Sequence, residues 1–238
     1  MYYGAPPIVT NGLVLALDAG NTKSYVSGST IWRDLTNPLV SGSLVNGPTF
    51  DINNGGSIVF DGVNDYVDNI GSVSDFSFIQ NTGIFTISSW VRLTDLSSAR
   101  YFLGNNDGTT SSKGFWFGYN SSNGALWFAI TYGVGGQNTI SYIRNNFFTD
   151  STWVLVTCVG NGTTCQFYKN SQIFDSSGAL GVLSTGNSTR TLSIGRINNF
   201  NGEYWKGNIS QTSIYNRALS QQEITQNYNA TKTRFGLS

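Results

Sequence analysis

Residues 114–132 read GFWFGYNSSNGALWFAITY, two aromatic-rich runs on either side of a Ser-Asn-Gly cluster. Alternate residues of a β-strand face opposite sides of a sheet, so Phe115 and Phe117 share one side and Trp116 takes the other. In the second run, Leu126 and Phe128 share one side and Trp127 takes the other. The pattern predicts two adjacent strands with one side in a core and aromatic rings left over for the other side.

Similar segments recur about every ten residues, separated by Gly, Asn, Asp and Ser clusters, which is typical of an all-β sandwich. We expect strands at residues 13–18, 57–62, 85–93, 100–104, 114–120, 125–132, 139–144, 152–159, 164–170, 190–196 and 203–216. Residues 21–55 are the least regular part and are expected to wrap an edge of the sheets.

A single helix is predicted near the end of the chain. Ser220 is followed three residues later by Glu223, the spacing of a capping box, at the start of SQQEITQNYNA. We therefore expect a short helix over residues 220–230.

Composition excludes several classes of protein. The 238 residues include no histidine, which excludes His-based triads and His-containing zinc or copper sites. Thirteen basic residues balance thirteen acidic ones without any basic run, so we expect neither nucleic-acid binding nor membrane insertion. With 14% aromatic residues the chain should fold, and we expect one domain, residues 13–238, after an N-terminal arm, residues 1–12.

Four segments, in this order, resemble the laminin-G-like branch of the concanavalin A-like lectin/glucanase superfamily. They are SIVFDGVNDYV (57–67), FTISSWVRL (85–93), STWVLVTCVGNGTTCQFYKNSQ (151–172) and IGRINNFNGEYWKGNISQTSIYNRALSQQEI (194–224). The resemblance implies a jelly-roll sandwich of two curved antiparallel sheets.

A narrower resemblance concerns the two ends of the chain. TNGLVLALDAGNTKSY (10–25), GSLVNGPTF (42–50) and QNYNATKTRFGL (226–237) are similar to laminin-G-like virion proteins of tailed bacteriophages. This implies a non-catalytic capsid-decoration or fibre protein at the virion surface, in a homo-oligomer or larger assembly.

The N-terminus fits that expectation. It has no basic region, and its apolar run, residues 13–17, is too short for a signal peptide, so we expect synthesis in a host cytoplasm. Residues 1–12 would dock on other virion proteins; the alternative is a frayed terminus.

The alternative function is a carbohydrate-binding module, or a glycoside hydrolase or lyase of the same superfamily. Hydrolases need two carboxylates close together. The chain has two glutamates, Glu203 and Glu223, and neither has an acidic residue two or four positions away. We therefore predict a protein without enzymatic activity.

Aromatic residues give the strongest indication of a binding site. Sugar rings stack on Trp and Tyr while neighbouring polar side chains bind their hydroxyls. The candidate glycan face is Trp116, Tyr132, Tyr142 and Arg144, with Asn105, Asn106 and Asp107 in the adjoining loop. The alternative is that these aromatic side chains only pack the sheets. Neutral surface glycans would be the ligands.

Calcium is the one cofactor that the sequence leaves open. Asp61, Asn64, Asp65 and Asp68 could supply the oxygens that calcium prefers, although we favour turn formation by these residues. The superfamily resemblance also implies a structural calcium between the amino-terminal and penultimate strands. The paired acids expected after GNI are here Ser210 and Gln211, which leaves backbone carbonyls near Asp18.

The two cysteines fall in one predicted hairpin. A two-residue Asn161-Gly162 turn would place Cys158 directly opposite Cys165, close enough for a disulfide. Because a reducing cytoplasm disfavours a bridge, we expect free thiols.

Overall fold

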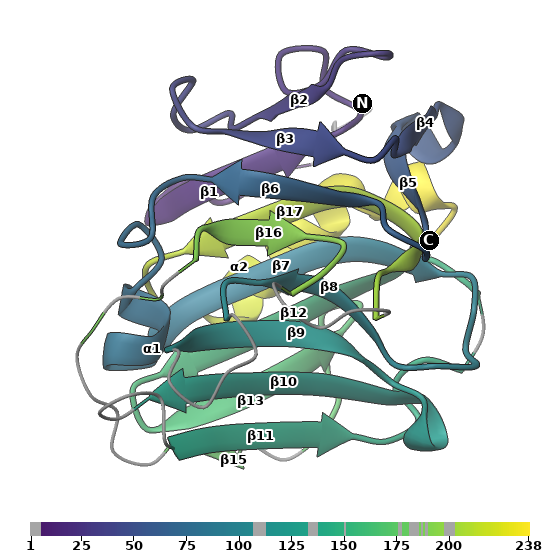
Figure 1. Ribbon diagram of the computed structural model, residues 1–238. Helices are drawn as coiled ribbons and strands as arrows, with labels where there is room; N and C mark the ends of the chain where they lie inside the picture. The colour runs from purple at the N-terminus through teal and green to yellow at the C-terminus, as the bar shows by residue number, and fades with distance from the viewer. Residues whose placement is uncertain are drawn as a thin grey trace, which may run out of the picture.

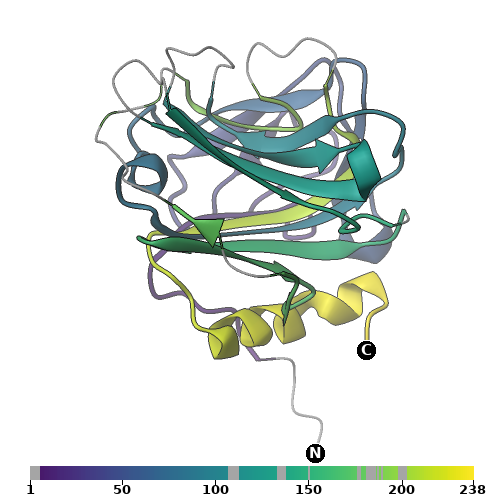
Figure 2. The same cartoon turned by 90° about the horizontal axis from the view of Figure 1, so that it is seen from below.

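The protein is described by a computed structural model at residues 6–106, 113–132, 138–149, 151–175, 178–180, 186, 188, 190–197 and 203–238. In this part of the chain two antiparallel sheets pack face to face as a jelly-roll sandwich (Figures 1 and 2). The predicted fold class is confirmed.

Within the described residues, sheet A has nine strands and sheet B has eight. Sheet A runs in the order β14 (Gln172–Ile173), β13 (Thr164–Lys169), β12 (Val154–Asn161), β7 (Ile84–Leu93), β17 (Lys206–Tyr215), β5 (Ser57–Asp61), β4 (Thr49–Asp51), with β1 (Leu13–Asp18) beside β17 and β15 (Gly178–Ala179) beside β13. Sheet B runs in the order β11 (Asn138–Arg144), β10 (Ala125–Tyr132), β9 (Gly114–Asn120), β8 (Arg100–Gly104), β16 (Leu192–Ile194), β6 (Tyr66–Ile70), β3 (Ser41–Val45), β2 (Ile31–Arg33).

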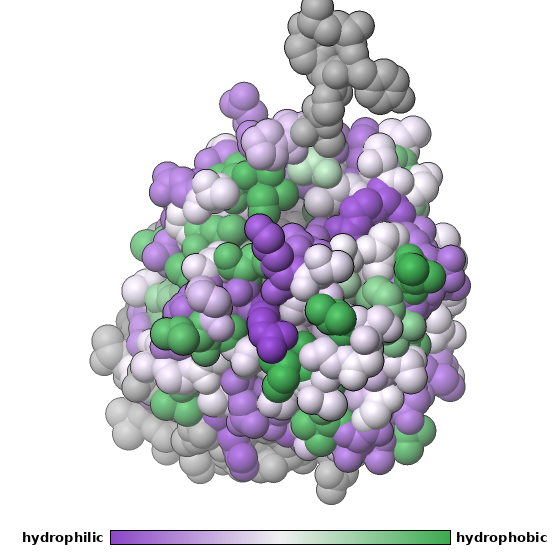
Figure 3. Space-filling model, turned by 90° about the horizontal axis from the view of Figure 1, so that it is seen from above, coloured by the Kyte–Doolittle hydropathy of each residue, from purple (hydrophilic) through white to green (hydrophobic). Residues whose placement is uncertain are grey.

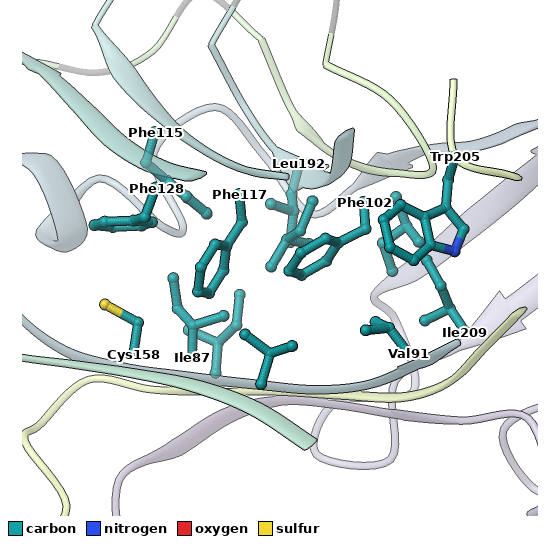
Figure 4. Close-up of a cluster of buried hydrophobic side chains, with 14 of the residues drawn as sticks. Ile87, Val91, Phe102, Phe115, Phe117, Phe128, Cys158, Leu192, Trp205 and Ile209 are labelled. Atoms are coloured by element: carbon teal, nitrogen blue, oxygen red, sulfur yellow. The ribbon is translucent and has the colours of Figure 1, made fainter. Parts of the chain in front are cut away.

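The core lies between the sheets. Phe115, Phe117 and Phe128 of sheet B are fully buried and point toward Ile87 and Cys158 of sheet A (Figure 4). The Phe117 ring centroid lies 5.0 Å from that of Phe128 and 4.9 Å from that of Phe102. The Phe side of the 114–132 hairpin is therefore the core side, because these rings bury the most apolar area there.

Residues 21–55 are more regular than the sequence indicates. They form β2, β3 and β4, and β2 and β4 lie at the outer ends of sheet B and sheet A. Strands as short as β2 and β4, three residues each, leave too little alternation to be found in the sequence. Seen from the β2 side, the surface mixes hydrophobic and hydrophilic residues (Figure 3).

The predicted helix is α2 (Gln221–Thr231), which continues into the 3₁₀ turn η4 (Lys232–Phe235). Ser220 is its N-cap, and the capping box is complete: the Ser220 hydroxyl accepts from the Glu223 amide, and the Glu223 carboxylate accepts from the Ser220 amide. α2 lies across the outer face of sheet A (Figure 2). Neither α2 nor the shorter α1 (Phe78–Thr82), within the described residues, could cross a bilayer.

The N-terminal segment packs on α2. The amide of Val9 donates to Asn227 Oδ1 at 2.8 Å, and the Val9 carbonyl accepts from the Tyr215 hydroxyl at 2.9 Å. Gln226 Nε2 also donates to the Pro7 carbonyl at 2.7 Å. The packing of the sandwich therefore begins before residue 13, where the sequence places the start of the domain.

Candidate functional site

The two outer faces of the sandwich differ. On sheet A, Trp90 stacks on Phe235 with ring centroids 4.0 Å apart, and its Nε1 donates to Thr231 Oγ1 at 2.8 Å. Trp153 also packs on Phe235, so both tryptophans are buried beneath α2 and η4. No helix of the described part lies across the outer face of sheet B, which Figure 1 shows from the front.

Aromatic rings gather on the outer face of sheet B. Because Phe115, Phe117 and Phe128 point into the core, the alternation of β9 and β10 turns Trp116 and Trp127 outward. Both are partly exposed, and their rings meet edge to face with centroids 5.9 Å apart. The Tyr101 ring, from β8, lies 5.7 Å from that of Trp127.

Gly118 makes this contact between β8 and β10 possible. It lies in register with both Tyr101 and Trp127, on the strand between them. A Cβ at this glycine would lie 2.7 Å from Tyr101 Cδ1 and 2.5 Å from the Arg100 carbonyl oxygen. Without a side chain at Gly118, the Tyr101 ring can lie over β9 and reach Trp127.

The aromatic rings continue toward β6. Tyr204 forms a backbone bridge with Tyr101, and its ring stacks on that of Tyr66 at 6.3 Å. Each of these tyrosines precedes a fully buried residue, Trp205 or Val67, which places its own side chain outward. We call Tyr66, Tyr101, Trp116, Trp127 and Tyr204 the aromatic face; Tyr101 is 1% exposed and the other four are partly exposed.

Ionisable groups beside the aromatic face are paired. The Arg196 guanidinium lies 3.4 Å from the Tyr66 ring centroid and binds Asp68 at 2.8 Å. Burial raises the pKa of Tyr101, and the hydrogen-bonded Glu203 carboxylate raises it further. Trp127 Nε1 donates to Ser141 Oγ at 2.6 Å. The face thus offers partly exposed rings beside the Ser141 hydroxyl and the Arg196–Asp68 pair, a combination suited to sugars.

The predicted glycan residues do not form one surface. Trp116 lies on the outer face of sheet B. Tyr142 and Arg144 lie on the core side of β11, where the Arg144 guanidinium is over the rings of Tyr142 and Phe167 and pairs with Asp175 at 3.2 Å. They are therefore not part of a face shared with Trp116, because β11 pairs with β10 in a register that puts Arg144 opposite Leu126 and Tyr142 opposite the buried Phe128.

The predicted loop residues are also distributed differently. Asn105 and Asn106 are 1% exposed. Asn105 Oδ1 accepts from the Phe115 amide at 3.0 Å, and Asn106 Nδ2 donates to Thr131 Oγ1 at 3.1 Å. Both asparagine side chains are therefore engaged in internal hydrogen bonds. Asp107 and the side chain of Tyr132 lie outside the described residues.

Sequence reasoning missed four members of the aromatic face. Trp127 could have been found, because it alternates with Phe128 as Trp116 does with Phe117. Tyr66 is the first residue of its strand, Tyr101 is the second of its strand, and Tyr204 precedes its strand, where alternation is hardest to follow. Nothing local indicates that Tyr204 meets Tyr101, 103 positions earlier in the printed sequence.

The residues considered for calcium form a turn between β5 and β6. Asp61 Oδ1 accepts from the amides of Val63 and Asn64, and Asp65 Oδ2 accepts from the Asp61 amide at 3.0 Å. Burial raises the pKa of Asp65, whereas for Asp61 the backbone donors outweigh burial and lower the pKa. Asp68 instead pairs with Arg196. Within the described residues, no three acidic or thiol side chains group in a way that could hold a metal.

The cysteine hairpin has a different register from the predicted one. Gly160 pairs with Cys165 and Cys158 pairs with Phe167, so the turn is shifted by one residue to Gly162-Thr163 and the cysteines are diagonal neighbours. The Asn161 side chain causes this shift, because its Oδ1 accepts hydrogen bonds from the amides of Thr163 and Thr164. Both thiols are free and fully buried, and they hydrogen-bond to each other.

The sequence matches the family model described as the concanavalin A-like lectin/glucanases superfamily over residues 60–225. The chain belongs to this superfamily. A search of curated protein sequences gives no match for this superfamily member.

Solved structures share the fold of this superfamily member at low sequence identity. The binding domain of Paraclostridial Mosquitocidal Protein 1 has a TM-score of 0.68 at 18% identity, covering 92% of this chain and 52% of that one. Domain 4 of AbnA, a GH43 extracellular arabinanase from Geobacillus stearothermophilus, in complex with arabinotriose, has a TM-score of 0.65 at 16% identity, covering 91% of this chain and 98% of that one.

A third similar structure is the Trypanosoma rangeli sialidase in complex with the inhibitor DANA. Its TM-score is 0.67 at 15% identity, covering 97% of this chain and 36% of that one. The chain thus spans about half of the mosquitocidal binding domain and about a third of the sialidase. The similarity shows the lectin-like fold of the superfamily, which occurs here in a binding domain, in a domain of an arabinanase and in a sialidase.

Proposed function

We propose that the chain is a non-catalytic carbohydrate-binding module that holds a neutral glycan on its aromatic face. The observation that carries this proposal is the partly exposed Trp116–Trp127 pair on the outer face of sheet B, which α2 does not cover. Ring faces of this kind bind the C–H surface of sugars, and the exposed Ser141 hydroxyl beside Trp127 is a neutral hydrogen-bonding group.

The arrangement of carboxylates supports the absence of catalysis. The Glu203 carboxylate hydrogen-bonds to Tyr101 beside the aromatic face, whereas Glu223 caps α2 and pairs with Arg217 at 2.6 Å. Asp61 and Asp65 are neighbours, but both accept backbone amides of their own turn, and Asp65 is 4% exposed. A glycosidase needs two carboxylates that reach opposite sides of one sugar bond.

Glycan binding is tested with a panel of neutral oligosaccharides, arabinotriose among them, by titration calorimetry on the full chain. Trp127→Ala should weaken binding by about tenfold or more, since an aromatic residue at the centre of a site contributes over about 1.4 kcal/mol. Ile173→Ala, at an exposed apolar residue of sheet A, is the matched control. Equal affinity of both variants, or turnover of any glycan in the panel, would contradict the proposal.

We further propose that the module is displayed on a bacteriophage virion, as capsid decoration or as part of a fibre, with residues 1–12 contacting other virion proteins. Residues 6–12 pack beside α2, on the side of the sandwich away from sheet B (Figure 2). Attachment there would leave the aromatic face outward. Many copies on one particle would bind host glycans by avidity even if each contact were weak.

The virion proposal is tested by comparing the full chain with a variant that begins at Ile8. Light scattering and electron microscopy should show assemblies of the full chain, alone or with particle proteins, that the shortened variant does not form. Glycan binding should be the same in both, which separates the two proposals. A full chain that stays monomeric and never co-purifies with virus particles refutes the virion role alone.

A further inference from the structure

Four segments that are distant in the sequence meet at the guanidinium of Arg234. Nη1 lies 3.1 and 3.0 Å from the two carboxylate oxygens of Asp18, at the end of β1, and Nη2 lies 3.1 Å from Oδ1. Nη2 also donates to the Gly55 carbonyl at 3.1 Å and to Ser210 Oγ of β17 at 3.3 Å. One side chain from the C-terminal turn η4 therefore joins β1, β17 and the segment before β5.

The site around the Arg234 guanidinium is tightly packed. Asp18 also accepts from the Gly20 amide at 2.9 Å and from Gln211 Nε2 at 2.8 Å. A Cβ at Gly20 would lie 2.3 Å from Arg234 Nη2 and 1.8 Å from the Gly55 carbonyl oxygen. A glycine at that position is what allows the backbone to approach the guanidinium.

The backbone of Arg234 is held as well. Its carbonyl accepts from Asn54 Nδ2 at 3.1 Å, and Asn54 Oδ1 accepts from Trp153 Nε1 at 3.0 Å. The next residue, Phe235, stacks on Trp90. The hydrogen bonds and the stacked rings together fix η4 in place, so the guanidinium is delivered by a rigid segment.

These residues do not fit a calcium ion. Calcium takes six to eight oxygens, usually with several carboxylates. Here the oxygens are one carboxylate of Asp18, one carbonyl of Gly55 and one hydroxyl of Ser210, and Gln211 presents its amide nitrogen to the carboxylate. The bidentate contact of Arg234 already satisfies the charge of Asp18.

We propose that Arg234 is a built-in cation that replaces a structural calcium between the amino-terminal strand and β17. Asp18, Gly55 and Arg234 all lie outside residues 60–225, the part that matches the superfamily. The Arg234–Asp18 pair therefore joins two segments that the family model does not match. Arg234 would hold β1, β17 and the segment before β5 together at this corner, so the stability of the sandwich there would not depend on the calcium concentration.

The proposal is tested by thermal unfolding of the full chain in excess EDTA and in millimolar CaCl₂. The midpoint of the wild-type protein should be the same in both. A rise with calcium that disappears in Asp18→Asn would overturn the proposal, because it would place the metal at Asp18.

Variants at Arg234 give a second measurement. Arg234→Met should lower the midpoint by about 4 °C or more, since it leaves Asp18 and Gly55 without their partner. Arg234→Lys should recover part of the loss, because a lysine keeps the charge but not the bidentate geometry. Arg33→Met, at an exposed arginine of β2, is the matched control. If Arg234→Met unfolds no earlier than Arg33→Met, Arg234 is not a structural cation.

Discussion

The ring of Tyr101 lies over Gly118, the residue opposite it on the neighbouring strand. Gly118→Ala should therefore destabilise the protein by about 1–3 kcal/mol, the usual cost of forcing atoms into filled space. It should also displace Tyr101 from Trp127 and change the near-UV circular dichroism. Ile173→Ala, at an exposed residue of sheet A away from these rings, is the control. A Gly118→Ala protein with the denaturation midpoint and spectrum of the wild type would show that the close contact is not required.

The Phe117 ring packs against three other rings, those of Phe102, Phe128 and Phe167. Phe117→Ala should lower the free energy of unfolding by about 3–5 kcal/mol, because it leaves a cavity between the sheets. Ile173→Ala, at a residue that is 62% exposed, should change it by less than about 0.5 kcal/mol. Urea denaturation measures both. Equal effects of the two variants would mean that the sandwich has no well-packed centre at Phe117.

The hydrogen-bonded ion pair with Arg217, together with the Ser220 amide, lowers the pKa of Glu223 to about 2. A carboxylate whose pKa is lower in the folded protein stabilises the fold above its unfolded pKa, near 4.5, and this stabilisation is lost as the pH falls toward 2. The stability of the wild-type protein should decline over that range, and Glu223→Gln should decline less. Urea midpoints measured from pH 6 to about pH 2 test this; parallel curves for the two proteins would disprove the assignment to Glu223.

Burial raises the pKa of Tyr215 to about 12. Its hydroxyl donates to the Val9 carbonyl and accepts from Asn227 Nδ2. A phenol with a raised folded-state pKa stabilises the fold below its ordinary pKa of 10.0, and the stabilisation is lost as the pH rises from there toward 12. Tyr215→Phe should be less stable by about 1–2 kcal/mol at neutral pH but should lose less stability under alkaline conditions. Unfolding monitored between these pH values distinguishes the two proteins.

Burial also raises the pKa of the Cys158 thiol, and neither Cys158 nor Cys165 is accessible. A thiol reagent should therefore label neither cysteine in the native protein and both after denaturation. Labelling should follow global unfolding as denaturant is added. Rapid labelling of the native protein would show that the β12–β13 hairpin opens locally.

Several elements were predicted from the sequence with their bounds almost unchanged. β1, β8, β9 and β10 agree at both ends, and α2 is displaced by one residue. Each depends on local information, either the alternation of a half-buried strand or the spacing of Ser220 and Glu223. The hairpin with the two cysteines was shifted because the Asn161 side chain selected a different turn.

The candidate site was predicted less well than the fold. Alternation places Trp116 on the side opposite Phe117 but does not say which neighbouring strands share that side. Tyr142 and Arg144 were grouped with Trp116 although they lie on the other side of sheet B, because the register of β11 against β10 does not follow from alternation within either strand. Tyr66, Tyr101 and Tyr204 required the strand order of the sheet.

The sequence by itself determined the two-sheet class, the aromatic core and the capped C-terminal helix, since each arises from residues a few positions apart. Only the tertiary structure decided that α2 covers the outer face of sheet A and not the aromatic face of sheet B. It also brought Arg234 to Asp18 across 216 positions. Such pairings follow from how the sheets fold over each other, and no local pattern encodes a contact between side chains that meet only after the whole sandwich has closed.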